Sequence, residues 1–143
     1  MKKILLSSLF AISLFGFDIK VHEPYARANP PTVINSASFM VLENISSKDI
    51  SLLSASSNIA KSVELHTHSL KDGVMTMYQV PKIDILANSK TELKPASFHI
   101  MFIDLNKDLK EGDIVNLTLD FSNGEKQELE IPVKSVMQKM KHH

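Results

Sequence analysis

The chain of 143 residues contains no cysteine. It therefore forms no disulfide bonds in an oxidising compartment, and its stability has to come from the packing of its core. We expect no lipid anchor, because lipid attachment needs a cysteine. A copper or zinc site built on thiolate is also excluded, so any soft metal ligand must be the sulfur of methionine.

The chain also carries no net charge at pH 7. Sixteen Lys and Arg residues balance sixteen Asp and Glu residues, and no basic stripe typical of nucleic-acid-binding proteins is visible. We therefore expect no nucleic-acid partner. The length of 143 residues is that of one domain with a core of its own.

The apolar run at Ile4–Leu14 is too short to span a bilayer. With Lys2 and Lys3 before it, the run is typical of a secretory signal peptide, and the small residue Gly16 predicts cleavage nearby. We expect residues 1–16 to be removed on export to the periplasm, which leaves a protein that does not span the membrane. The alternatives are a buried first helix and a retained N-terminal anchor.

Short stretches of alternating apolar and polar residues follow, and they predict an all-β sandwich or barrel at residues 17–135. Asn123-Gly124 is the best hairpin signal in the chain. We see no internal repeat and no second domain. The predicted strands are Phe17–Val21, Ala37–Glu43, Ile50–Ala55, Val63–Thr67, Val74–Val80, Thr91–Leu93, Phe98–Leu105, Val115–Phe121 and Leu129–Val133.

Soft and borderline metal ligands recur as three pairs. Each pair is spaced i, i+2, which places both of its side chains on the same face of a strand. Because Leu65 and Ile100 alternate with these residues, the pairs are predicted to face away from the core. They are His66 with His68, Met75 with Met77, and His99 with Met101.

Thioether sulfur is a soft ligand and imidazole a borderline one, so the pairs suit Cu(I) better than Mg, Ca or Mn. Taken alone, a strand methionine often fills a gap in packing, and a strand histidine is often only solvated. The conjunction of three pairs favours a metal site over these interpretations. Met40 lies in an apolar strand and is predicted to be core, whereas the neighbours of His22 offer it no clear partner.

Four of these residues stand at distinctive spacings. Ten residues separate His66 from Met77, and twenty-one separate Met77 from His99. One residue then separates His99 from Met101. This order and spacing resemble the motif of the periplasmic copper chaperones called PCu(A)C. Other segments that resemble the family are Tyr25–Ala28 with Pro30-Pro31, Val63–His66, Asp72–Met75, and Leu109 with Gly112-Asp113.

The resemblance implies a cupredoxin-like or immunoglobulin-like Greek-key β-sandwich that holds one Cu(I). It implies a metallochaperone rather than an enzyme. Such a protein passes copper by ligand exchange toward cytochrome oxidase assembly, to a copper-accepting oxidase subunit or to another periplasmic copper chaperone. The implied ligands are His66, Met77, His99 and Met101, with His68 and Met75 as candidate auxiliary ligands.

One segment departs from the family pattern. The family often has a Gly-Gly pair just before its second motif histidine, where this chain has Ala96-Ser97-Phe98. We expect this difference to alter the shape of the loop more than the ligands.

The C-terminal tail, residues 136–143, carries further soft donors. Some family members have tails rich in Met and His that add a second copper site, often for Cu(II). The resemblance therefore implies a candidate second Cu(II) site here. The alternatives are a tail with no binding role and, for the last two histidines, the remnant of an expression tag. The tail donors are Met137, Met140, His142 and His143.

Two other functions stay open on the sequence. A periplasmic copper buffer or resistance protein would use the same ligands without needing a docking partner. A metal-free immunoglobulin-like interaction module would share the β pattern, since a fold does not fix a function. No Ser-His-Asp set and no pair of carboxylates stands out, so we expect no enzyme activity.

Overall fold

The computed structural model describes residues 16–135, which form ten β-strands and contain no helix. Accordingly, no helix able to cross a membrane occurs within this range. The predicted signal segment up to residue 15 and the tail donors Met137, Met140, His142 and His143 lie outside the described residues. The strands are β1 (Ile19–Arg27), β2 (Ser36–Asn44), β3 (Ile50–Ser56), β4 (Ala60–Lys71), β5 (Val74–Gln79), β6 (Ile83–Ile85), β7 (Ser89–Leu93), β8 (His99–Leu105), β9 (Ile114–Phe121) and β10 (Lys126–Lys134).

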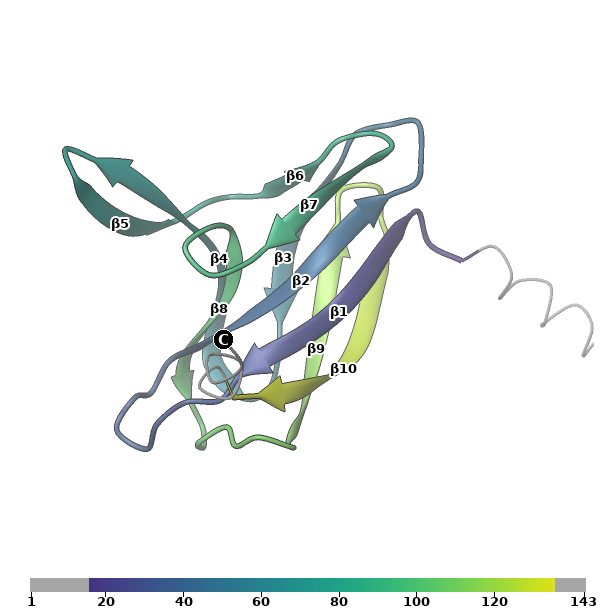
Figure 1. The fold of residues 1–143 in the computed structure, drawn as a ribbon. Helices are drawn as coiled ribbons and strands as arrows, with labels where there is room; N and C mark the ends of the chain where they lie inside the picture. Colours follow the sequence, from purple (N-terminus) through teal and green to yellow (C-terminus); the bar gives the residue numbers. More distant parts are fainter. Residues whose placement is uncertain (1–15, 136–143) are drawn as a thin grey trace, which may run out of the picture.

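The strands form two layers (Figure 1). The front layer has the order β5-β4-β8-β2-β1, and the back layer has the order β10-β9-β3-β6. A short parallel pairing of β1 with β10, at Ala26↔Val133 and Arg27↔Lys134, joins the two layers. Strand β7 pairs with β2 at Met40–Asn44, beyond the part of β2 that pairs with β8. The predicted all-β sandwich is confirmed.

The core lies between the layers because apolar side chains alternate along each strand and point inward. Met40 of β2 and Phe102 of β8 come from the front layer, and Leu117 of β9 and Ile131 of β10 come from the back layer. All four are almost completely buried. Burial of each such side chain contributes about 1.5–3 kcal/mol. The prediction that Met40 belongs to the core is confirmed.

Several strands run past their predicted bounds, as β4 does at Ala60–Lys71 against Val63–Thr67, and two elements differ further from the sequence prediction. Strand β6 was not predicted, because three residues are too short for a periodic signal, yet Ile85 pairs with Ile50 of β3. Strand β1 continues to Arg27, past a register shift between His22 and Tyr25. Glu23 has a positive φ of 50° at this shift, and such a β-bulge lets a strand resume its pairing.

The β4–β5 hairpin positions the methionine pair at the edge of the front layer. It extends away from the body of the sandwich in Figure 1, and within the described chain β5 pairs only with β4. Its turn contains Asp72 and Gly73, which have positive φ angles of 54° and 79°. All six residues of β5 are exposed, so both faces of this strand lie in solvent.

The β9–β10 hairpin turns at Asn123-Gly124, as predicted, and Gly124 has a φ of 93°. We expect Gly124→Ala to lower the free energy of unfolding by about 1–2 kcal/mol, because an L side chain is strained at this φ. A Cβ atom at Gly124 would meet nothing within 4 Å, so backbone strain alone is tested. Urea unfolding measures the effect, and Glu128→Ala on β10 is the control. Equal stability of Gly124→Ala and wild type would contradict this turn geometry.

Candidate metal centre

The strand registers bring the three predicted pairs onto one face. His66 of β4 lies directly opposite His99 of β8, and His68 lies directly opposite Met77 of β5. Directly opposed residues of an antiparallel pair project from the same face. This is the outer face of the front layer, as the alternation predicted. It carries His66, His68, Met75, Met77, His99 and Met101, from the neighbouring strands β5, β4 and β8.

The three imidazole rings form a cluster around His99. The ring centroid of His99 lies 5.2 Å from that of His68 and 5.8 Å from that of His66. Phe39 of β2 packs on the same ring, at 6.2 Å. His99 is consequently only 3% exposed, although it faces away from the core as predicted.

Glu64 orients the ring of His66. Nε2 of His66 lies 2.8 Å from Oε1 of Glu64 and donates a hydrogen bond to it, since an ionised carboxylate only accepts. In the neutral ring, the lone pair then lies on Nδ1. That Nδ1 is buried and has no hydrogen-bond partner among the described residues. A carboxylate on the far nitrogen is the arrangement that orients most metal-binding histidines.

His99 is oriented the opposite way. Its Nδ1 donates to the backbone carbonyl of Ser97 at 2.9 Å, which leaves the lone pair of the neutral ring on Nε2. Burial lowers the pKa of His99 below its usual value, and the nearby His68, His66 and Arg27 lower it further, against the raising effect of the Ser97 hydrogen bond. The neutral ring, which is the form that binds a metal, is therefore favoured.

His68 completes the cluster. Its Nδ1 is buried, and like Nδ1 of His66 it has no hydrogen-bond partner among the described residues. A buried nitrogen without a partner costs about 1–3 kcal/mol, which a bond to a bound cation would offset. The simple interpretation of His68 as a solvated surface histidine therefore does not hold.

The sulfur donors become more exposed toward the edge of the sheet. Met101 lies opposite Glu64 on β4 and is partly buried, whereas Met77 is 41% and Met75 52% exposed. Within residues 16–135, no group of three or more His, Asp or Glu side chains is arranged to hold a metal ion. The cluster on this face is a mixed one of imidazole and thioether, and this donor set fits the soft cation Cu(I).

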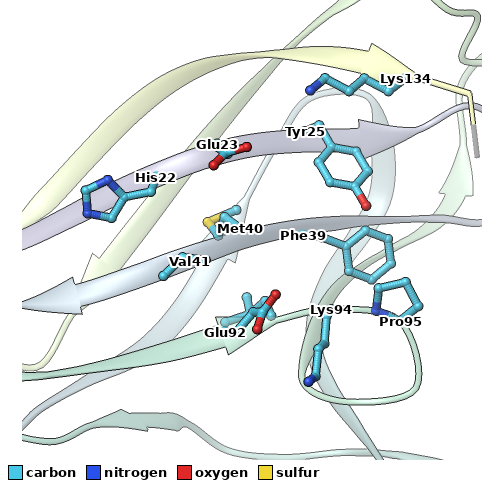
Figure 2. Close-up of a pocket in the computed structure, with 11 residues that line it drawn as sticks. His22, Glu23, Tyr25, Phe39, Met40, Val41, Glu92, Lys94, Pro95 and Lys134 are labelled. Atoms are coloured by element: carbon cyan, nitrogen blue, oxygen red, sulfur yellow. The ribbon is translucent and has the colours of Figure 1, made fainter. Parts of the chain in front are cut away.

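A pocket of about 220 Å³ lies farther along the front layer and shares Phe39 with the cluster (Figure 2). It contains none of the six predicted donors. His22 lines this pocket, and its ring is 2.8 Å from Glu43, so the expectation that His22 has no partner is wrong. The partner was missed because β1 and β2 bring Glu43 close only once they are paired.

In the loop before His99, Ala96-Ser97-Phe98 stands where the family often has a Gly-Gly pair. Ala96 has a positive φ of 67°, a conformation that glycine adopts without strain. Hydrogen bonds from Lys94 N to Phe98 O and from Ser97 N to Lys94 O close the loop, at 3.0 and 3.1 Å. Ala96 is therefore strained, and the loop presents the Ser97 carbonyl to His99.

The chain resembles known proteins in its sequence. The profile of the family described as "Putative lipoprotein LpqE-like" matches residues 19–133. The chain is 33% identical over 100 residues to the putative lipoprotein Lxx21020 of Leifsonia xyli subsp. xyli, covering 69% of this chain and 60% of that protein. It is 30% identical over 118 residues to the uncharacterized protein RP573 of Rickettsia prowazekii, covering 78% and 64%. The chain thus spans less than two thirds of the length of these relatives.

The fold of the chain also resembles several solved structures. Apo-DR1885 from Deinococcus radiodurans matches with a TM-score of 0.64 and 30% identity, covering 85% of this chain and 81% of that one. Its CuI form matches with a TM-score of 0.62 and 29% identity, covering 87% and 84%. The copper-bound PCuAC domain from PmoF2 has a TM-score of 0.71 at 19% identity, covering 83% and 94%, a likeness of fold alone. The predicted cupredoxin-like or immunoglobulin-like sandwich is confirmed.

The hydrogen bonds predict different tautomers for two histidines. In the copper-free protein at neutral pH, we expect the proton of neutral His66 on Nε2 and that of His99 on Nδ1. Histidine ¹⁵N chemical shifts distinguish the two forms. In Glu64→Ala, His66 should lose its preference for Nε2–H while His99 keeps its own. The matched control is Glu43→Ala, which removes the other His–Glu pair of the front layer and should leave both rings unchanged. Nδ1–H on His66 in the wild type would contradict the assignment.

The loop geometry gives a second prediction. Ala96→Gly should raise the free energy of unfolding by about 0.5–1 kcal/mol, because relief of the positive φ outweighs the added freedom of the unfolded chain. Chemical unfolding of the copper-free protein measures it. Ala55→Gly, at a buried position of β3 without a positive φ, should lower the stability instead. Destabilisation by both changes would show that Ala96 is not strained.

Proposed function

This chain belongs to the LpqE-like family, which is the PCu(A)C family, and from that premise we propose that it binds one Cu(I) as cargo and passes it on. The observation that carries the proposal is the mixed donor face of β5, β4 and β8. Two imidazole nitrogens on this face are buried and have no hydrogen-bond partner within residues 16–135. The donor chemistry is that of a copper site without thiolate.

We infer that the cargo is held by His66, Met77, His99 and Met101. His66 would bind through Nδ1 and His99 through Nε2, since these nitrogens carry the lone pairs that the Glu64 and Ser97 hydrogen bonds leave free. The two methionines supply neutral sulfur. A set without a charged ligand holds Cu(I) and still allows it to leave, which suits a carrier.

The uneven exposure of the donors supports transfer by ligand exchange. His99 is held under Phe39, whereas Met77 lies on the exposed edge strand, where an acceptor can approach the ion. An acceptor's own ligands then take over the ion one bond at a time, so copper is never free in solution. In this proposal the chain acts by binding and transfer, without catalysing a reaction.

The compartment and the acceptor are further parts of the proposal. The description of the relatives as putative lipoproteins supports export, and the predicted signal segment points to the periplasm. Two similar structures, CuI-DR1885 and the PmoF2 domain, are copper-bound. We propose that the acceptor belongs to the assembly of cytochrome oxidase, as a copper-accepting oxidase subunit or another periplasmic copper chaperone. A second site for Cu(II) in the tail stays a sequence prediction.

A Cu(I) competition titration against a chromophoric chelator tests the site. The wild type should bind one equivalent tightly. Met77→Leu and Met101→Leu keep the apolar volume but remove the sulfur, so each should weaken Cu(I) binding by about tenfold or more. Met40→Leu is the matched control, because Met40 is buried in the core.

Three results would sink the proposal: no binding by the wild type, binding unaffected by either variant, or equal weakening by Met40→Leu. The first would favour a metal-free interaction module, and the second would place the copper on other ligands. Tight binding by the wild type without transfer to any acceptor domain would favour a copper buffer.

A further inference from the structure

His68 stands outside the four-residue motif but inside the cluster. Its ring is the nearer of the two β4 imidazoles to His99, at 5.2 Å against 5.8 Å for His66. Its Nδ1 is shielded from solvent without a hydrogen-bond partner among the described residues. The register also places it directly opposite Met77, whereas His66 lies opposite Gln79. His68 is thus the histidine that connects the exposed methionine strand with the buried ring of His99.

The registers divide the donors into two neighbouring couples. The inner couple, His66 and His99, bridges β4 and β8, with Met101 two residues along β8. The outer couple, His68 and Met77, bridges β4 and β5, with Met75 two residues along β5. Directly opposed residues have Cβ atoms about 4.5–5.5 Å apart, a separation that one bound ion can span. Both couples are therefore placed to hold a metal.

The two couples differ in access to solvent. The inner couple is covered, since the side chain of His66 is 12% exposed and His99 is held under Phe39. In the outer couple, His68 is partly buried like His66, and the difference lies in the sulfur: Met77 is 41% exposed and the neighbouring Met75 52%. An ion that moves from the inner to the outer couple thus moves from a shielded position to one that an acceptor can reach.

We propose that His68 and Met77 form an outer Cu(I) position through which the cargo leaves the inner one. This inference rests on the proposed function and extends it. In the step between positions, the bond from copper to Nδ1 of His66 breaks as a bond to Nδ1 of His68 forms. Met77 keeps its bond, and His99 and Met101 release the ion afterwards. Copper stays Cu(I) and no electron is transferred. Both nitrogens bind through lone pairs, so no proton is transferred between them.

The first test follows histidine ¹⁵N shifts as Cu(I), which is diamagnetic, is added to the full chain. We expect Nδ1 of His68 to shift or broaden together with Nδ1 of His66 and Nε2 of His99. His22, which lies opposite Val41 on the β1–β2 pair and bonds Glu43, is the internal control and should not respond. A response of His66 and His99 with His68 unchanged would overturn the outer position.

The second test compares affinity with the rate of transfer to a bidentate chromophoric chelator. His68→Leu should slow the transfer by about tenfold, equivalent to about 1.4 kcal/mol in the barrier, while the Cu(I) affinity changes by less than about threefold. His68→Met restores a soft donor of similar size and should recover most of the rate. A merely structural role of His68 would make both variants equally slow.

These measurements distinguish failure of the proposed Cu(I) binding from failure of the outer position. A wild type that binds no Cu(I) means that the proposed function fails. Tight wild-type binding, with transfer rates unchanged in His68→Leu, means that the outer position alone is wrong. His22→Leu is the matched control and should leave both affinity and rate unchanged, since His22 lies outside the cluster.

Discussion

The pairing register of β4 with its two neighbours is the constraint on which the site depends. Side chains alternate with a period of two, so a slip of one residue would turn His66 toward the core and Leu65 toward solvent. The buried faces of β4 and β8 hold the register in place, because Leu65 and Ile100 lie directly opposite one another inside the sandwich. Core packing on one face thus fixes the donor geometry on the other.

Two features of this site lower the stability of the folded state. Two buried imidazole nitrogens find no hydrogen-bond partner in the part of the chain that the structure describes, and Ala96 holds a positive φ in the loop before His99. Each feature disfavours the folded state by an amount comparable to one lost hydrogen bond. The β-sandwich tolerates them because its core is continuous and apolar from both layers. If the proposed site is correct, this loss of stability is the cost of holding the donors in place before an ion binds.

Local alternation was enough to predict most strands, the hairpin at Asn123-Gly124 and the face on which the donors lie. Features that depend on pairing between distant strands were not predictable. The His22–Glu43 contact needs the β1–β2 register, and the depth of His99 needs Phe39 from another strand. The role of Glu64 was missed, although its position two residues before His66, on the same face of the strand, was a usable signal. The ligand roles themselves remain predictions, as do the signal segment and the tail donors.

Strand β5 leaves the side chains of Met75 and Met77 exposed to solvent, and its exposure also affects solubility. Val74–Gln79 is an uncharged edge strand with exposed apolar side chains, and its outer backbone groups pair with no strand in residues 16–135. Such an edge is a template for another strand, including the same strand of a second molecule. Lys71 and Asp72 before it and Lys82 after it place charges at both ends, the usual protection against stacking. The exposure that leaves Met75 and Met77 open to solvent thus also leaves the strand open to self-association, which the flanking charges oppose.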